Sequence, residues 1–441
     1  MLGFQALGIE WVSYLLIGTV LVLLVTGLPL AFVTGLTAMI FTYGWFGPIA
    51  FPLITSRVYG FLNEYVLVAI PMFVLMASIL DRSGIARDMY ATMRLLAGRL
   101  PGGVAIQTLV VALFLAAMSG IIGGEIVLLG LLALPQMLRM GYDRSLAIGT
   151  VCAGGSLGTM VPPSIVLIIY GLTANVSIGE LFVATVIPAL LLGGLYITYI
   201  IVRCTINPAL APPLPPEELD IPLAEKLQSI KNIILPVLVA VLVLGSIYGG
   251  IASVTEASSM GVLGVLLSTW VRGELKWSML HKSLRQTLNT CGMIVWIGIG
   301  ANALVGAYNL MGGNRFVEGA ILGLDVAPLV IIMVMMAILL LLGLFMDWIG
   351  IALLTMPIFV PIVIKLGFDP IWFGILFSMN MQVSYLSPPF GPAAFYLKSV
   401  APPDITLGVI FKSMWPFILI QIFALSMVLS FPQIALWLPG L

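Results

Sequence analysis

Long apolar segments constrain this chain more than any other feature of its sequence. Segments able to cross a bilayer recur along its whole length, among them 28–46, 179–202 and 254–271. Hydrophobic residues make up 61% of the chain and charged residues 8%. Because hydrocarbon offers no hydrogen bonds, a spanning segment must satisfy its own backbone, and these runs far exceed the roughly 10 residues of a barrel strand. The sequence therefore predicts an all-α polytopic membrane protein whose solvent is the lipid bilayer.

The charged and reactive residues exclude several classes of function. Lys and Arg number 18, as do Asp and Glu, so no basic field is available to bind nucleic acid. One histidine and three scattered cysteines, Cys152, Cys204 and Cys291, cannot form a Cys/His metal centre or a disulfide framework. Catalytic motifs and a glycine-rich phosphate loop are also missing from the sequence. We therefore expect no enzyme and no direct use of ATP, which leaves transport driven by an ion gradient.

The chain contains an internal duplication. A gapless shift of 226 residues superposes LPQMLRMGYD on VPIVIKLGFD. The same shift pairs these special residues: Pro135 with Pro361, Asp143 with Asp369, Pro162 with Pro388, and Pro163 with Pro389. A double proline and a Gly-aromatic-Asp rarely match by chance at one offset. We interpret 1–207 as a first repeat, 208–231 as a linker ending in an amphipathic helix, and 232–441 as a second repeat.

Each repeat has one apolar run too long for a single span and one run that is broken. The 103–138 run could not fit one crossing of a ~30 Å hydrocarbon core at ~1.5 Å per residue, so it predicts a re-entrant helical hairpin. Its counterpart is 326–364. The broken helices are 145–172 and 371–396. The prediction is about ten spans plus two re-entrant hairpins.

The distribution of positive charge predicts the topology. Five crossings and one hairpin per half would turn the second repeat upside down relative to the first. If the first hairpin opens toward the cytoplasm, then the linker and a 272–285 loop lie there too, and only Arg57, Arg315 and Lys365 of the 18 basic residues face outward. Both chain termini would then be periplasmic.

The two broken helices are the first candidate site. In GGSLGTMVPPS, Pro162 and Pro163 lack the backbone donors that would satisfy carbonyls one turn earlier. Such unwound backbone at mid-membrane is tolerable only against protein or a wet cavity, and its carbonyl oxygens are ready cation ligands. The second break, YLSPPFG, adds the hydroxyls of Ser384 and Ser387. The alternative is a pair of packing kinks.

The two hairpin tips should each approach the break of their own half. The second tip contains Gly343 and Asp347, and a carboxylate within an apolar segment is a functional candidate because an unpaired charge there costs at least ~2.5 kcal/mol. In the first tip, SGIIGGE, Glu125 could be functional or could pair structurally with a helix N-terminus or an arginine. Glu256, which follows Ser253, is better explained as part of a helix cap.

Taken together, four segments resemble one family. SGIIGGE, GGSLGTMVPPSIVLIIYG, GGIASVTEASSMG and LFMDWIGIALLTMPIFVPIV are similar to the large membrane subunit of TRAP transporters, the tripartite ATP-independent periplasmic carriers, over essentially the whole chain. The resemblance implies an elevator with a scaffold domain and a mobile transport domain in the bacterial inner membrane. It also implies three partners: a small four-helix membrane subunit, a periplasmic substrate-binding protein, and a small organic anion of the carboxylate or sulfonate class.

The resemblance further implies coupling to Na⁺ at two sites. Carried onto this chain, the sodium ligands are Ser119, Gly158, Val161 and Pro163 at one site, and Gly343, Ser384, Ser387 and Pro389 at the other. Residues expected to bind substrate or to gate it are Gly120, Gly123, Gly155, Ser156, Pro162, Asp347 and Pro388. Many relatives have a Ser-Gly-Ser-Ser tip, whereas Ile121 and Ile122 stand here, so the first site has lost a hydroxyl ligand.

Other functions remain open from the residues alone. The nearest alternative is a self-sufficient inverted-repeat transporter, coupled to protons or sodium, without a binding protein. A channel would require a continuous polar pore, which the apolar spans do not offer, and a membrane-embedded enzyme would require catalytic groups.

The first testable prediction is the topology. Single cysteines introduced on a cysteine-free background should react with a membrane-impermeant reagent from outside at 313–325 and only after permeabilisation at 203–231. Labelling of positions near Leu214 from outside alone would contradict the inverted arrangement.

Overall fold

The computed structural model describes residues 3–97, 100–120, 123–213 and 223–440, and within these ranges the chain is helical with no β-strand. Among the described residues, seven helical segments are long and apolar enough to cross a membrane, and shorter apolar helices accompany them. The predicted all-α polytopic membrane fold is confirmed.

The first half contains α1 (Gly8–Val25), α2 (Leu30–Phe46), α3 (Phe51–Leu62), α4 (Ala69–Arg82), α5 (Ile85–Ala97), α6 (Gly103–Ser119), α7 (Gly124–Arg139), α8 (Arg144–Ser156), α9 (Ile165–Ala174), α10 (Ile178–Ala184) and α11 (Val186–Ile206). The second half contains α13 (Leu223–Tyr248), α14 (Val254–Val271), α15 (Trp277–Leu310), α16 (Gly313–Leu322), α17 (Pro328–Gly343), α18 (Trp348–Lys365), α19 (Pro370–Leu386), α20 (Pro392–Lys398), α21 (Leu407–Ser430) and α22 (Gln433–Leu436). Short 3₁₀ turns are η1 (Phe4–Leu7), η2 (Pro48–Ala50), η3 (Tyr65–Val68), η4 (Leu157–Thr159) and η5 (Pro208–Leu210).

The helices repeat at the offset seen in the sequence. Helix α7 ends at Arg139 and α18 at Lys365, while α8 begins at Arg144 and α19 at Pro370, and both pairs are 226 residues apart. Each run predicted to form a hairpin is a pair of helices, α6 with α7 and α17 with α18. The long α15 takes the place that α3 and α4 share in the first half, where the chain is interrupted at Asn63 and Glu64.

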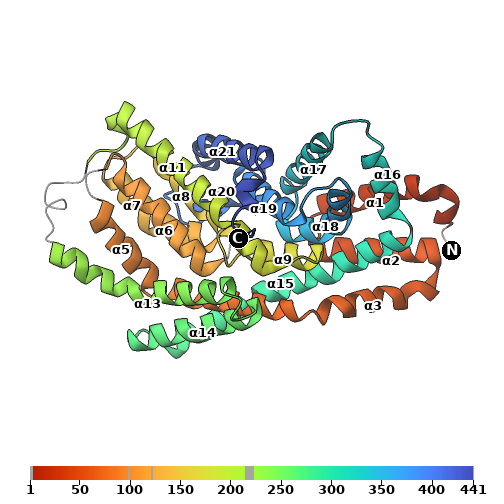
Figure 1. The fold of residues 1–441 in the computed structure, drawn as a ribbon, viewed down its shortest axis with the longest axis horizontal. Coiled ribbons are helices and arrows are strands. Elements are labelled where there is room, and N and C mark those ends of the chain that lie inside the picture. Colours follow the sequence, from red (N-terminus) through yellow and green to blue (C-terminus); the bar gives the residue numbers. More distant parts are fainter. Residues whose placement is uncertain (1–2, 98–99, 121–122, 214–222, 441) are drawn as a thin grey trace.

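The helices form two layers (Figure 1). Helices α2, α3, α13, α14 and α15 lie along one side, and the hairpin helices with α8, α19, α20 and α21 lie along the other. Helix α15 packs against α2, α3 and α4, and it also contacts α18. The second layer has a dense aromatic core, in which Tyr170 stacks on Phe377 and the Trp372 indole N–H donates to the Val428 carbonyl oxygen at 2.9 Å. Helix α15 is therefore the main contact between the layers.

Three segments differ from the sequence-based expectation. The expected 272–285 loop was too long, because α15 begins at Trp277 and His281 lies inside that helix. The amphipathic helix α5 was not expected, since its mixture of charged and apolar residues does not make a membrane span. The helical end of the 208–231 linker runs directly into α13, which begins at Leu223, and 214–222 lie outside the described residues. Helices α13 and α15 thus both begin with amphipathic turns that precede their apolar spanning parts.

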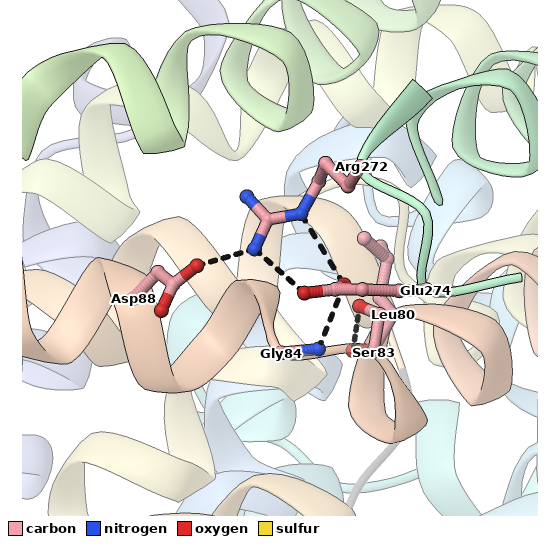
Figure 2. A network of polar contacts seen from close by, with 6 residues as sticks. All are labelled: Leu80, Ser83, Gly84, Asp88, Arg272 and Glu274. Atoms are coloured by element: carbon pink, nitrogen blue, oxygen red, sulfur yellow. Dashed lines mark hydrogen bonds and ion pairs between the residues drawn. The ribbon is translucent and has the colours of Figure 1, made fainter. Parts of the chain in front are cut away.

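A charged network joins the two halves at the α14–α15 loop (Figure 2). The Arg272 guanidinium forms an ion pair with Asp88 of α5 and donates to both carboxylate oxygens of Glu274, at 3.2 Å from Nε and 3.1 Å from Nη2. Glu274 also accepts from the Gly84 amide at 3.1 Å. The hydrogen bond from Arg272 and the Gly84 amide lower the pKa of Glu274 below its ordinary value. The network therefore fixes the α4–α5 junction to the α14–α15 loop when Glu274 is ionised.

This gives a prediction about pH. A carboxylate whose folded-state pKa is lowered contributes stability above its unfolded pKa and loses it as pH falls through the folded value. Glu274→Gln should therefore lower the thermal unfolding midpoint of the purified protein at neutral pH. The difference from wild type should shrink as the pH falls through and below the ordinary Glu range, about 4. Glu10→Gln, at an exposed position in α1, is the matched control. A pH-independent difference would contradict the ionic explanation.

Candidate functional site

The first hairpin tip lies directly against the first helix break. Helix α6 ends at Ser119, and Gly120 follows in the left-handed conformation with φ of 58°. A Cβ atom at Gly120 would overlap the carbonyl oxygen of Pro163. Only glycine combines this backbone angle with so close an approach. The break between α8 and α9 is thus covered by the tip of its own half.

The rest of the first break is buried against α7. Val161, Pro162 and Pro163 are all buried. A Cβ at Gly155 would overlap Ile126, and one at Gly158 would lie 3.0 Å from the Glu125 carboxylate. Glu125 is 1% exposed and lies in the first turn of α7, where the helix N-terminus favours negative charge. This position supports the structural role of Glu125.

Ser156 connects the first break to the second half. Its hydroxyl donates to the Ala153 carbonyl at 2.7 Å, and its own carbonyl accepts from the Gln382 side-chain amide at 3.2 Å. Ser156 and Gln382 are 226 residues apart and so occupy equivalent places in the two repeats. Equivalent residues can touch only close to the pseudo-two-fold axis. The two broken helices therefore cross next to that axis.

The second tip and break are built in the same way but are less buried. A Cβ at Gly343 would overlap the Ser384 hydroxyl, so the backbone at the end of α17 packs directly on the Ser384 side chain of α19. Ser384 donates to the Asn380 carbonyl at 3.2 Å and Ser387 to the Val383 carbonyl at 2.6 Å. Each hydroxyl oxygen keeps its lone pairs for a cation. Pro388 is half-buried and Pro389 is exposed.

Asp347 begins the second half of its hairpin. It is the N-cap of α18, and its side chain accepts from the Ile349 amide at 2.9 Å. Its side chain is nevertheless exposed toward a cavity between the layers. Asp347 thus has a capping role that sequence reasoning had not assigned, and it still places negative charge at the cavity wall.

This central cavity has a volume of about 170 Å³ and contacts both hairpin tips. Its lining residues are Gly120, Ile165, Thr290, Met293, Ile294, Gly343, Met346, Asp347, Trp348, Ile349, Met381, Ser384, Tyr385, Pro392 and Tyr396. The rings of Tyr385 and Tyr396 stack with centroids 6.5 Å apart. Tyr385 is buried, and its hydroxyl has no hydrogen-bond partner among the described residues. A polar group of a ligand in the cavity could satisfy it.

The structure brings some sequence-predicted residues to the central cavity and leaves others at the breaks. Gly120, Gly343, Asp347 and Ser384 line the cavity. Gly123 lies just behind it, since a Cβ there would be 2.8 Å from the Tyr396 ring. Gly155, Ser156, Gly158, Val161, Pro162, Pro163, Ser387, Pro388 and Pro389 belong to the breaks and not to the cavity lining. The Ser119 side chain, Ile121 and Ile122 lie outside what the structure describes.

Sequence reasoning missed the contribution of α15. Thr290, Met293 and Ile294 line the cavity from the opposite layer, yet they lie within a long apolar helix that has no local irregularity. Tyr396 could have been found, because it occupies the place of Tyr170 in the duplication. The expected cap at Glu256 is confirmed, with reciprocal hydrogen bonds between Ser253 and Glu256 at 2.8 and 3.3 Å.

The donor chemistry of the breaks suits a hard monovalent cation. Among the described residues, no group of three or more His, Cys, Asp or Glu is arranged to hold a metal ion. The breaks instead offer neutral oxygens from serine hydroxyls and from backbone carbonyls next to the double prolines. Neutral ligands suit an ion that must be released in each cycle.

Paired hairpins that cover paired broken helices, around a small cavity between two helical layers, define a secondary-transporter architecture. The YdaH transporter of Alcanivorax borkumensis shares this fold, with a TM-score of 0.63 and 17% identity over 89% of each chain.

Sequence comparison identifies the family. The family model of the tripartite ATP-independent periplasmic transporter, DctM component, matches residues 17–434. The chain is 28% identical over 95% of both chains to the C4-dicarboxylate TRAP transporter large permease protein of Vibrio cholerae. It is 30% identical to the same permease of Pseudomonas aeruginosa, over 90% of this chain and 91% of that one. The chain belongs to the large permease subunits of the TRAP transporters.

Family membership settles the class of the protein. It is a multi-pass TRAP permease of the bacterial inner membrane, and its relatives are permeases and not enzymes. The family is tripartite, which implies a small membrane subunit and a periplasmic binding protein as partners.

Proposed function

We propose that this permease drives uptake of a small carboxylate or sulfonate with a sodium gradient, that the substrate is delivered by a periplasmic binding protein, and that transport follows an elevator mechanism. The two relatives compared above are named for C4-dicarboxylates, and others 27–28% identical are named for isethionate, sialic acid and ectoine. These names support the substrate class and leave the particular substrate to experiment.

The observation that carries sodium coupling is the pair of serines at the second break. Ser384 and Ser387 both donate their protons to carbonyls of their own helix, so both oxygens can only accept or ligate. They stand next to Pro388 and Pro389, which have no amide to donate, and Gly343 allows the hairpin tip to approach Ser384 closely. The Asp347 carboxylate on the facing hairpin adds negative charge nearby. A sodium ion at this break would hold the hairpin tip against the broken helix, which would couple ion binding to substrate binding.

The layers support the elevator. Helices α2, α3, α13, α14 and α15 would form the scaffold, and the hairpins with their broken helices would move along it. The central cavity lies between the two, with Thr290 on one wall and Asp347 on the other. A substrate bound in this cavity would contact the moving layer next to both hairpin tips, where the proposed sodium sites lie.

The prediction that tests sodium coupling uses two substitutions. Ser387→Ala should raise the sodium concentration for half-maximal uptake roughly tenfold, the equivalent of about 1.4 kcal/mol of lost ligation. Asp347→Asn should raise it further, because asparagine preserves the helix cap while removing the charge. The measurement is substrate uptake as a function of sodium concentration. The proteoliposomes contain the permease and its small subunit, and the added binding protein is loaded with each member of a panel of carboxylates and sulfonates.

Ser426→Ala is the matched control, since Ser426 makes the same hydrogen bond to a carbonyl four residues earlier, at an exposed position of α21 that does not line the central cavity. Its sodium dependence should stay that of wild type. Unchanged sodium dependence in both test variants would reject the assignment. Uptake by the permease without its binding protein would favour the self-sufficient transporter, and a reduced yield without a sodium effect would favour packing kinks.

A further inference from the structure

A second cavity lies further along α15 and has no role in the proposed function. Its volume is about 550 Å³, and its walls come from α3 and α15 on one side and from α9 and α18 on the other. Polar groups face it from both layers, among them Ser56, Arg57, Thr173 and Asn302. This outer cavity is large enough for a small organic acid.

Arg57 is the cation of this outer cavity. Within the described part of the chain, Arg57 forms no ion pair or hydrogen bond. Its stem packs on α15, because a Cβ at Gly306 would lie 3.0 Å from the Arg57 Cγ atom. Glu64 also lines the cavity, just beyond the end of α3, and no ion pair joins it to Arg57 among the described residues. Arg57 is exposed, so its five guanidinium donors are open to a ligand.

Neighbouring groups complete a site for an anion. Asn302 uses one side-chain N–H to donate to the Gly298 carbonyl at 2.9 Å, which leaves the other N–H available. The Ser56 hydroxyl has no partner among the described residues. A guanidinium with nearby amide and hydroxyl donors suits the planar or trigonal oxygens of a carboxylate or sulfonate.

A packed layer separates this outer cavity from the central one. Ile294 lines the central cavity and Asn302 the outer one, eight residues or about 12 Å apart along α15. Between them, Gly298 carries the buried Phe61 ring so closely that a Cβ there would overlap it. The two cavities are thus successive chambers along one helix.

The equivalent place in the other repeat is closed. At the 226-residue offset between the repeats, Gln286 is equivalent to Gly60 of the outer cavity, and Ser283 is equivalent to Arg57. There, Gln286 accepts from Ser78 at 3.1 Å and from Arg82 at 2.6 Å, and Ser283 donates to the Ser78 carbonyl at 3.2 Å. In an inverted-repeat carrier, the two equivalent places belong to opposite sides of the membrane. One repeat therefore has an open cavity at Arg57, and the other repeat is closed at the equivalent place. This difference is expected of a carrier that is open on the Arg57 side of the membrane.

We propose that this outer cavity is a substrate-binding vestibule, in which Arg57 binds the carboxylate or sulfonate of the incoming anion before it reaches the central cavity. The proposal rests on the proposed function for the direction of transport, but the binding step itself does not require sodium. Arg57 is one of the three basic residues that the charge distribution places on the outer face.

The test measures binding separately from transport. Ser56→Cys is introduced into the permease with Cys152, Cys204 and Cys291 replaced, and the complex with its small subunit is reconstituted. The rate of reaction with a membrane-impermeant maleimide is measured with succinate, isethionate, ectoine or glucose present. At least one of the two anions, succinate and isethionate, should slow labelling of Ser56→Cys severalfold, and glucose should not. Arg57→Gln should raise the concentration for half-protection at least about tenfold.

Two further variants make the outcome specific. Arg57→Lys keeps the charge but loses the two-pronged donor geometry, so protection should be weakened but retained. Arg315→Gln removes an exposed cation on the same expected face that lines neither cavity, and should leave protection unchanged. Absence of protection by either anion, or equal protection in Arg57→Gln, would overturn the proposal. Sodium-independent uptake with intact protection would instead overturn the proposed function and leave the vestibule standing.

Discussion

The need to satisfy backbone polar groups within an apolar solvent determines the rest of this structure. Two helices are broken by double prolines inside the bundle, and each proline removes an amide that would otherwise pair with a carbonyl one turn earlier. Other donors satisfy these carbonyls: the Ser164 and Ser378 hydroxyls donate to the Thr159 carbonyl, and the Ser387 amide donates to the Ser384 carbonyl. Each break is covered by the tip of a helical hairpin, and in both cases a glycine makes that approach possible: Gly120 against Pro163 and Gly343 against Ser384. The same contacts place neutral oxygens between each hairpin tip and its broken helix, where an ion could bind. Under the proposed function, the atoms that close the breaks are also those that would bind sodium.

The duplication gives the protein two such helix breaks, each covered by a hairpin tip. The Ser156–Gln382 hydrogen bond joins equivalent residues, so the two breaks meet near the pseudo-two-fold axis. The repeats are nevertheless not identical in detail. The first break is fully buried, the second is partly exposed, and α15 is continuous where α3 and α4 are interrupted. These differences between equivalent places are what an alternating carrier requires, since each conformation exposes one side at a time.

Much of this architecture could be predicted from the sequence because its signals are strong and local. Apolar runs identify spanning helices, and double prolines identify the breaks. The 226-residue offset reproduces helix ends such as Arg139 and Lys365. The contribution of Thr290 to the central cavity could not be predicted, because nothing in its own helix distinguishes it from lipid-facing neighbours. Asp347 was recognised as a candidate from its cost in the membrane, but its capping bond to Ile349 depends on where α18 begins.

The central claim is that each broken helix holds one sodium ion during transport. Its most direct test is the reversal potential of substrate flux in proteoliposomes that contain the permease and its small subunit, with substrate-loaded binding protein supplied. The substrate gradient is held fixed while the sodium gradient and the membrane voltage are varied. Two coupled sites predict a thermodynamic stoichiometry of at least two sodium ions per substrate. A reversal potential that does not respond to the sodium gradient, or that responds as for a single ion, would contradict the account.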